Sequence, residues 1–175
     1  MPIPSFPIRR LCISLLLASA GGVACAGVVK VSFVEQDKFS DAGTTRWEAR
    51  SNLRLLAEHL EALGKSELPA DQTLTVDVLD VDLAGVVEPS RHNGTDIRIV
   101  RGRADWPRIH LRYTLESPGR LAVHGEEDLA DMNYQQDGLS SGRGSAPLFY
   151  EKRMLDKWLK RQFAVLQAGG SDSVP

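Results

Sequence analysis

The densest group of residues that could bind a ligand lies between residues 98 and 108. Arginine and tryptophan interleave over this short stretch, at Arg98, Arg101, Arg103, Trp106 and Arg108. A guanidinium binds a carboxylate or phosphate through two parallel hydrogen bonds, and an indole adds apolar contact area. These residues therefore predict a site for a small anionic ligand or an envelope protein partner. The alternative is a solvated face whose arginines pair with acidic residues such as Asp77 and Glu126.

Aspartates and histidines form a second candidate group, on segments that are expected to be strands. Asp80 and Asp82 would share one face of a strand. His110 and His124 would lie on the polar face of a hairpin, where they could face each other. Carboxylates and imidazoles bind divalent metals, but the chain lacks the paired histidines of zinc enzymes and the glycine-centred loop of calcium sites. Solvated polar side chains are the favoured interpretation, and no metal or other cofactor is predicted.

The letters of a serine-hydrolase motif occur once, from Gly138 to Gly142. That chemistry needs a strand before the serine, a helix after it and a histidine later in the chain. Polar residues precede Ser140, and no histidine follows it in the sequence. The segment from Asp131 to Ala146 is rich in glycine, serine and glutamine, which is typical of a mobile loop. The sequence therefore predicts no catalytic residue.

Hydropathy patterning defines the elements that would position these residues. Residues 45–63 begin with a capping box, Thr45 and Glu48, and then repeat leucine at three- and four-residue steps, which predicts a helix. A second helix is predicted from Pro147, which suits a first helical turn, up to Gly169. Strands are predicted at 28–34, 74–83 with a β-bulge near Val78 and Leu79, 97–99, 109–113 and 121–123. The order strand-helix-strands-helix predicts an α+β domain: a mainly antiparallel sheet of about five strands with two helices covering one face.

The first 26 residues have the features of a cleavable export signal. Arg9 and Arg10 precede a short apolar run, and the segment ends with Ala24-Cys25-Ala26, whose small outer residues suit a signal peptidase. The run is shorter than the roughly 20 residues that cross a bilayer, so no transmembrane segment is expected after processing. Cleavage would produce a periplasmic protein. Alternatively, Cys25 could be the lipidated first residue of a tethered structural lipoprotein.

Processing would leave 149 of the 175 residues, which is the size of one domain. We expect that domain at 27–168, followed by a flexible tail at 169–175. Both cysteines, Cys12 and Cys25, lie in the signal, so the mature domain would contain no cysteine and no disulfide. The formal net charge of −2 becomes −4 without the two arginines of the signal, which argues against nucleic-acid binding.

Four segments of the chain resemble one bacterial family. They are residues 76–85 (VDVLDVDLAG), 96–100 (DIRIV), 106–109 (WPRI) and 150–155 (YEKRML). In combination they resemble the domain-of-unknown-function family number 3016, over residues 29–163. The resemblance implies an exported, proteobacterial envelope protein without an established activity, and it assigns no catalytic residue.

From the sequence we therefore expect a non-enzymatic accessory or binding protein of the cell envelope. The alternative is a metal-assisted envelope hydrolase, whose ligands would be drawn from Asp80, Asp82, His110 and His124.

Overall fold

The computed structural model describes residues 27–90, 96–136 and 146–169, with side chains described up to residue 162. Several sequence-based predictions lie outside these ranges. They are the export signal with Cys25, the serine motif around Ser140, most of the loop that contains it, and the tail after residue 169. Among the described residues, no helix is long and apolar enough to cross a membrane.

The main sheet has four strands in the order β1-β2-β5-β6. They are β1 (Val28–Phe33), β2 (Thr73–Asp82), β5 (Arg108–Glu116) and β6 (Val123–Ala130). β2, β5 and β6 pair antiparallel, but β1 runs parallel to β2. The parallel pair forms because the helix α1 (Arg46–Glu67) connects β1 to β2 and returns the chain to the same end of the sheet. The prediction is therefore matched in part: β2, β5 and β6 are antiparallel as expected, but the main sheet is mixed and has four strands instead of about five.

The predicted β-bulge lies in β2, where the pairing with β5 shifts between Val78 and Asp80. Leu79 is the additional residue, so the apolar side chains before and after it point to the same face. Val76, Val78 and Val81 are all buried. The bulge thereby keeps the whole length of β2 in the core, although its hydrophobic alternation changes phase.

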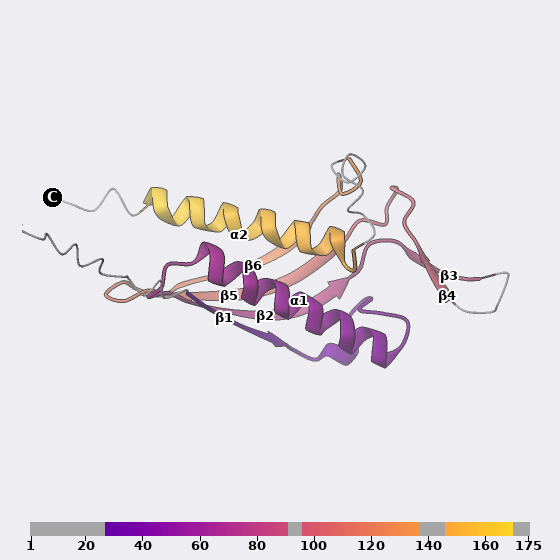
Figure 1. The fold of residues 1–175 in the computed structure, drawn as a ribbon, viewed down its shortest axis with the longest axis horizontal. Coiled ribbons are helices and arrows are strands. Elements are labelled where there is room, and N and C mark those ends of the chain that lie inside the picture. Colours follow the sequence, from indigo (N-terminus) through magenta and orange to yellow (C-terminus); the bar gives the residue numbers. More distant parts are fainter. Residues whose placement is uncertain (1–26, 91–95, 137–145, 170–175) are drawn as a thin grey trace, which may run out of the picture.

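Both helices cover the same face of the main sheet, and the other face is left open (Figure 1). The second helix is α2 (Phe149–Gly169). The core is formed by apolar side chains from α1, α2, β2 and β5, which include Leu56, Leu60, Val76, Leu111, Leu155, Trp158 and Leu159. Trp158 also makes an edge-to-face contact with Tyr113, with ring centroids 5.7 Å apart. The prediction of two helices on one face is confirmed.

The start of α1 follows from its capping residues. Thr45 is the N-cap, and its side-chain oxygen accepts a hydrogen bond from the backbone N–H of Glu48 at 3.1 Å. The carboxylate of Glu48 accepts in turn from the backbone N–H and the hydroxyl of Thr44. Glu48 is thereby held at the end of α1 that lies nearest the candidate site described below.

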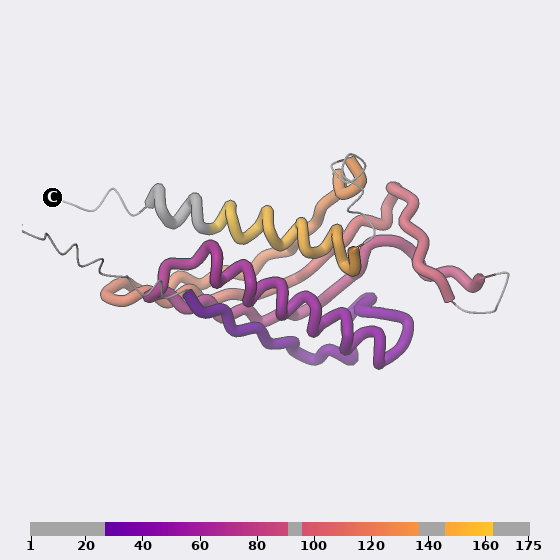
Figure 2. The backbone as a smooth tube through the Cα atoms, in the orientation of Figure 1, coloured from indigo at the N-terminus to yellow at the C-terminus, as the bar shows by residue number. Residues whose placement is uncertain are grey.

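Two short strands form a separate hairpin: β3 (Val86–Pro89) and β4 (Asp96–Ile99). Figure 2 shows the chain leaving the end of β2, running out into this hairpin and returning to β5. Gly85 makes the first turn, with a φ of 92°, and a side chain there would meet the carbonyl oxygen of Ile99. Residues 97–99 were predicted as a strand of the main sheet. They pair instead with β3, because the short connection at Gly85 carries the chain away from the sheet edge.

Candidate binding site at the base of the hairpin

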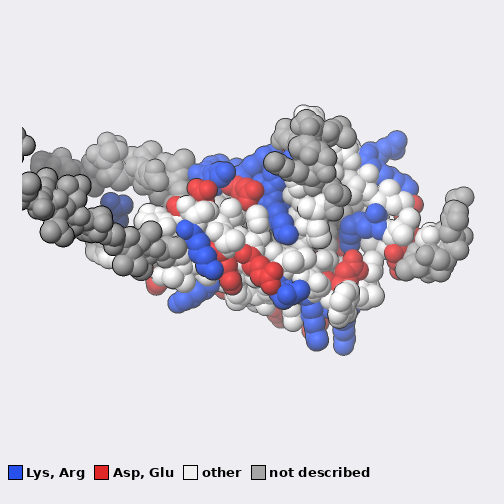
Figure 3. Space-filling view, in the orientation of Figure 1, with Lys and Arg blue, Asp and Glu red and all other residues white. Residues whose placement is uncertain are grey.

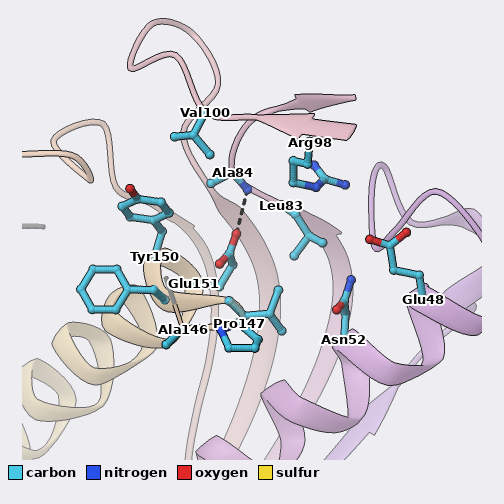
Figure 4. A pocket seen from close by; sticks show the side chains of 12 residues that line it. Glu48, Asn52, Leu83, Ala84, Arg98, Val100, Ala146, Pro147, Tyr150 and Glu151 are labelled. Carbon is cyan, nitrogen blue, oxygen red and sulfur yellow. Dashed lines mark hydrogen bonds between the residues drawn. The ribbon is translucent and has the colours of Figure 1, made fainter. Parts of the chain in front are cut away.

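A cavity of about 240 Å³ lies where the hairpin joins the body of the protein. Its walls come from the first turns of α1 and α2, the end of β2, and β4 (Figure 4). Among the described residues, five side chains with polar atoms line it: Glu48, Asn52, Arg98, Tyr150 and Glu151. The remaining wall is mainly apolar, so this cavity combines a few polar groups with hydrophobic surface, as small-ligand sites do.

Glu151 is the most buried charged residue of this site, with only 3% of its surface exposed. One of its carboxylate oxygens accepts a hydrogen bond of 2.7 Å from the backbone N–H of Ala84, just after β2. Burial raises the pKa of Glu151, and the hydrogen bond from Ala84 and the nearby charges of Arg98 and Lys152 only partly oppose it. A carboxyl with this environment is a common feature of functional sites.

Arg98 joins the hairpin to the body of the protein. Its guanidinium donates two hydrogen bonds to the carboxylate of Asp41, both at 2.8 Å, and both side chains are largely buried. Burial lowers the pKa of Arg98, but the contacts with Asp41 and the more distant charges of Glu48 and Glu151 outweigh burial and raise it. The guanidinium is therefore charged, and Asp41 already neutralises it.

Asp41 is itself fixed to the end of β2. Its backbone N–H donates to the carbonyl of Val81 at 2.8 Å, and its carbonyl accepts from the N–H of Leu83 at 3.0 Å. The ion pair of Asp41 with Arg98 therefore ties β4 to the end of β2 in the main sheet.

The loop after β4 is organised by the carboxylate of Asp105. It accepts hydrogen bonds from the backbone N–H groups of Arg101 and Arg103 and from the hydroxyl of Tyr134, at 2.7, 2.8 and 2.8 Å. Tyr134 is buried, and burial together with Asp105 raises its pKa to about 12. These contacts hold the backbone of the loop in place and leave the side chains of Arg101 and Arg103 at the surface.

The five residues predicted to bind an anion or a partner do not converge on one cavity. Arg98 alone lines the cavity described above. Arg101 forms an ion pair with Glu88 of β3 at 2.5 Å. Arg108 lies on β5, 3.4 Å from Asp82, with its guanidinium 5.0 Å above the ring of Trp106. Arg103 is exposed and has no ion pair within the described residues.

The aspartate and histidine candidates lie on the open face of the main sheet but are divided between two places. His110 is paired with Asp80 on one side and Asp128 on the other, and its ring nitrogens lie 3.0 Å from Glu126 and 3.0 Å from Asp128. His124 is opposite Thr114, to which it is hydrogen-bonded at 2.9 Å. His124 and Asp128 are four residues apart on β6, which corresponds to roughly 13 Å.

The expectation that His110 and His124 face each other is therefore wrong, because the turn sets a different register. Asp80 accepts hydrogen bonds from the backbone and hydroxyl of Ser40. Within the described residues, no three metal-ligating side chains are placed to hold a metal ion.

Sequence reasoning missed Glu48, Asn52 and Glu151 as candidate site residues. For Glu151 a signal exists, because it lies three residues after Leu148 and three before Met154 on the apolar stripe of α2. A carboxylate on the stripe that faces the core needs a specific partner, which here is the backbone of Ala84. For Asn52 and Glu48 the sequence offers only a polar helix surface.

The fold and the cavity define an α+β domain with a helix-covered mixed sheet and a small polar cavity beside a projecting hairpin. Residues 27–161 match the family described as "Protein of unknown function (DUF3016)", and the chain belongs to that family. This confirms the resemblance that the four sequence segments indicated. No curated protein and no solved structure matches the chain.

Proposed function

We propose that this chain is an exported, non-enzymatic binding protein of the cell envelope. It docks an envelope protein through the hairpin β3–β4 and the loop that follows it, where Arg101, Arg103 and Trp106 lie. The features of the first 26 residues support export. The family to which the chain belongs is described as of unknown function, so the support for binding comes from the surface of the molecule.

The observation that carries this proposal is the projecting hairpin. Val86 and Ile97 are each 45% exposed, although a globular protein gains stability by burying such side chains. Isolated two-stranded hairpins are marginally stable in water, and this one forms its own sheet, separate from the main sheet. Apolar side chains kept at the surface of a projecting element are suited to a partner that covers them.

The loop beside the hairpin adds charge to this surface. Basic side chains protrude over the β4–β5 loop in Figure 3, whereas Lys, Arg, Asp and Glu are interspersed over the two helices. Asp105 and Tyr134 fix the loop backbone, so little order has to be gained on binding. The partner surface that fits is apolar at its centre, with carboxylates that face Arg101 and Arg103.

Export is tested by the intact mass of the protein purified from the periplasm of its host. A mass that starts at Gly27 supports the soluble periplasmic form. A diacylated Cys25 replaces it with a tethered lipoprotein, and an unprocessed chain in the cytoplasm contradicts export.

Docking is tested by a photo-crosslinking amino acid at Ile97, introduced in cells that produce the protein at its normal level. We expect one discrete crosslinked partner, which is lost in Arg101→Glu with Arg103→Glu. Arg120→Glu is the matched control, since Arg120 is equally exposed in the turn between β5 and β6. A crosslinking pattern that is the same in all three proteins contradicts this docking surface.

A further inference from the structure

We propose that the cavity at the base of the hairpin binds a small organic cation, an ammonium group carried on a short apolar chain. This site lies beside the surface proposed for docking: Arg98 and Val100 belong to the cavity wall, whereas Arg101, Arg103 and Trp106 do not.

The charges around the cavity favour a cation. Glu48 and Glu151 line it, and Asp41 lies directly behind Arg98. The guanidinium of Arg98 is engaged by Asp41 through two hydrogen bonds, so its charge is already compensated. Among the described residues that line the cavity, Arg98 is the only basic one, so the two glutamates give this wall a net negative charge. A concave site with an excess of one sign of charge concentrates ligands of the opposite sign.

Hydrogen-bonding capacity points the same way, because acceptors remain beside the glutamates, while the hydroxyl of Tyr150, which also lines the cavity, can donate or accept. The backbone N–H of Ala84 is bound to Glu151, and the amide nitrogen of Asn52 donates to the carbonyl of Ala42 at 2.9 Å. The amide oxygen of Asn52 and one carboxylate oxygen of Glu48 accept no hydrogen bond from the described residues. An ammonium offers three donors and no acceptor, whereas a carboxylate ligand would find mainly other acceptors.

The size of the cavity and the residues of its walls determine which group the ammonium of the ligand can carry. About 240 Å³ lies below the usual range for drug-sized ligands, so the occupant is small. Leu83, Val100, Pro147 and Leu148 supply apolar wall, which suits a short hydrocarbon chain.

The backbone of Leu148 has an uncommon conformation in the wall of this cavity. Its φ of 55° lies in the left-handed region, which is unfavourable for a leucine. Backbone strain of this kind occurs preferentially at active sites and ligand-binding sites. Here it places Leu148 in the cavity wall at the start of α2, next to Glu151.

The test uses n-butylammonium as the probe and butyrate as a probe of the same length and opposite charge. Binding to the purified protein is followed by NMR, through the backbone amide signals of Ala84, Arg98 and Glu151. We expect saturable shifts with butylammonium at millimolar concentration and none with butyrate. Binding of butyrate that equals or exceeds that of butylammonium overturns the proposal, as does the absence of saturable shifts up to about 100 mM, a range set by typical weak affinities.

Amino-acid substitutions test whether butylammonium binds in this cavity. Glu48→Gln and Glu151→Gln remove a charge but keep an oxygen for Thr44 and Ala84, so both should fold and bind butylammonium at least tenfold more weakly. Glu61→Gln, on the exposed surface of α1, is the matched control and should bind as the unmodified protein does. Equal affinity in all three variants overturns the proposal. The pair Arg101→Glu and Arg103→Glu should leave this affinity unchanged, which separates the outcome from that of the docking experiment.

Discussion

The main sheet and the hairpin β3–β4 are stabilised in different ways. The sheet buries apolar side chains beneath two helices, with Val76, Leu111 and Trp158 almost completely inaccessible. The hairpin leaves Val86 and Ile97 exposed and is joined to the body by polar contacts of Arg98 and of the Ala84 backbone. The comparison shows that the exposed apolar side chains of the hairpin are not needed to hold the fold together. They are therefore available to bind a partner.

The largest expected effect lies in the core beneath the helices. Trp158→Ala should lower the free energy of unfolding by about 3–5 kcal/mol, because it removes a large buried ring and leaves a cavity. Denaturation by guanidinium chloride measures this loss. Arg161→Ala, on the exposed side of the same helix, is the control and should cost less than about 1 kcal/mol. A loss of similar size in both variants would mean that α2 is not anchored by its apolar face.

A close contact between α1 and β1 gives the next largest effect. A side chain at Gly64 would collide with the side chain of Val29, which is buried beneath the helix. Gly→Ala in a helix normally stabilises by about 1 kcal/mol, but here crowding should reverse the sign and cost about 1–3 kcal/mol. Chemical denaturation of Gly64→Ala measures this. Adding Val29→Ala should restore part of the loss, and a simple sum of the two single effects would contradict the collision.

The elements that the sequence predicted well are those with one strongly apolar face. The helix predicted at 45–63 is observed as Arg46–Glu67, and the bulge predicted near Val78 and Leu79 is present in β2. Both follow from burial, since leucines at helical spacing and valines at alternate positions must point to one core. The Thr45 cap adds a local signal that does not depend on tertiary structure.

The elements that the sequence predicted poorly are those at the edge of the sheet or outside it. The last strand was expected at 121–123 and is observed at Val123–Ala130, while Leu121 is exposed. β6 is an edge strand with one face open to solvent. It carries Glu126, Glu127 and Asp128 in succession, so it lacks the alternating apolar residues by which a strand is recognised in a sequence. The parallel pairing of β1 depends on the path of α1, which hydropathy alone does not determine.

The residues of the candidate site were also predicted only in part. Arg98 was identified from its type and from neighbouring arginines, but its partner Asp41 lies 57 residues away in the chain. Without that pairing the sequence indicated an anionic ligand, whereas the cavity that contains Arg98 is bordered by Glu48 and Glu151.

The attachment of the hairpin should be weakened by Arg98→Ala. Hydrogen bonds between charged, largely buried groups are worth about 1.5–3 kcal/mol, so hydrogen exchange at β3 and β4 amides should become at least tenfold faster. Exchange in β2 and β5 should change much less, because apolar burial protects those strands. Arg101→Ala is the control, since the pair of Arg101 with Glu88 is exposed and should contribute less than about 1 kcal/mol. Exchange that accelerates equally in the sheet and the hairpin would show that the two regions form one cooperative unit.

The smallest effect is expected on the open face of the sheet, at Asp77. The hydroxyl of Ser32 donates to its carboxylate and Arg112 lies 3.2 Å away, and these contacts lower the pKa of Asp77 although burial opposes them. A carboxyl whose pKa is lower in the folded state stabilises the fold above the unfolded value of about 3.8. That contribution is lost as the pH falls through the folded pKa.

Asp77→Asn should therefore cost less than about 1 kcal/mol at neutral pH, as exposed ion pairs do, and almost nothing below the folded pKa. Denaturant unfolding of both proteins at several pH values measures the difference. Glu116→Gln, at the exposed end of the neighbouring strand β5, is the control and should show no such dependence on pH. Glu151 should affect stability with the opposite dependence on pH. Because its pKa is raised in the folded state, its protonated form favours folding, and its contribution to stability declines as the pH rises. A cost for Asp77→Asn that grows toward acidic pH would contradict the assignment of its carboxylate to Ser32 and Arg112.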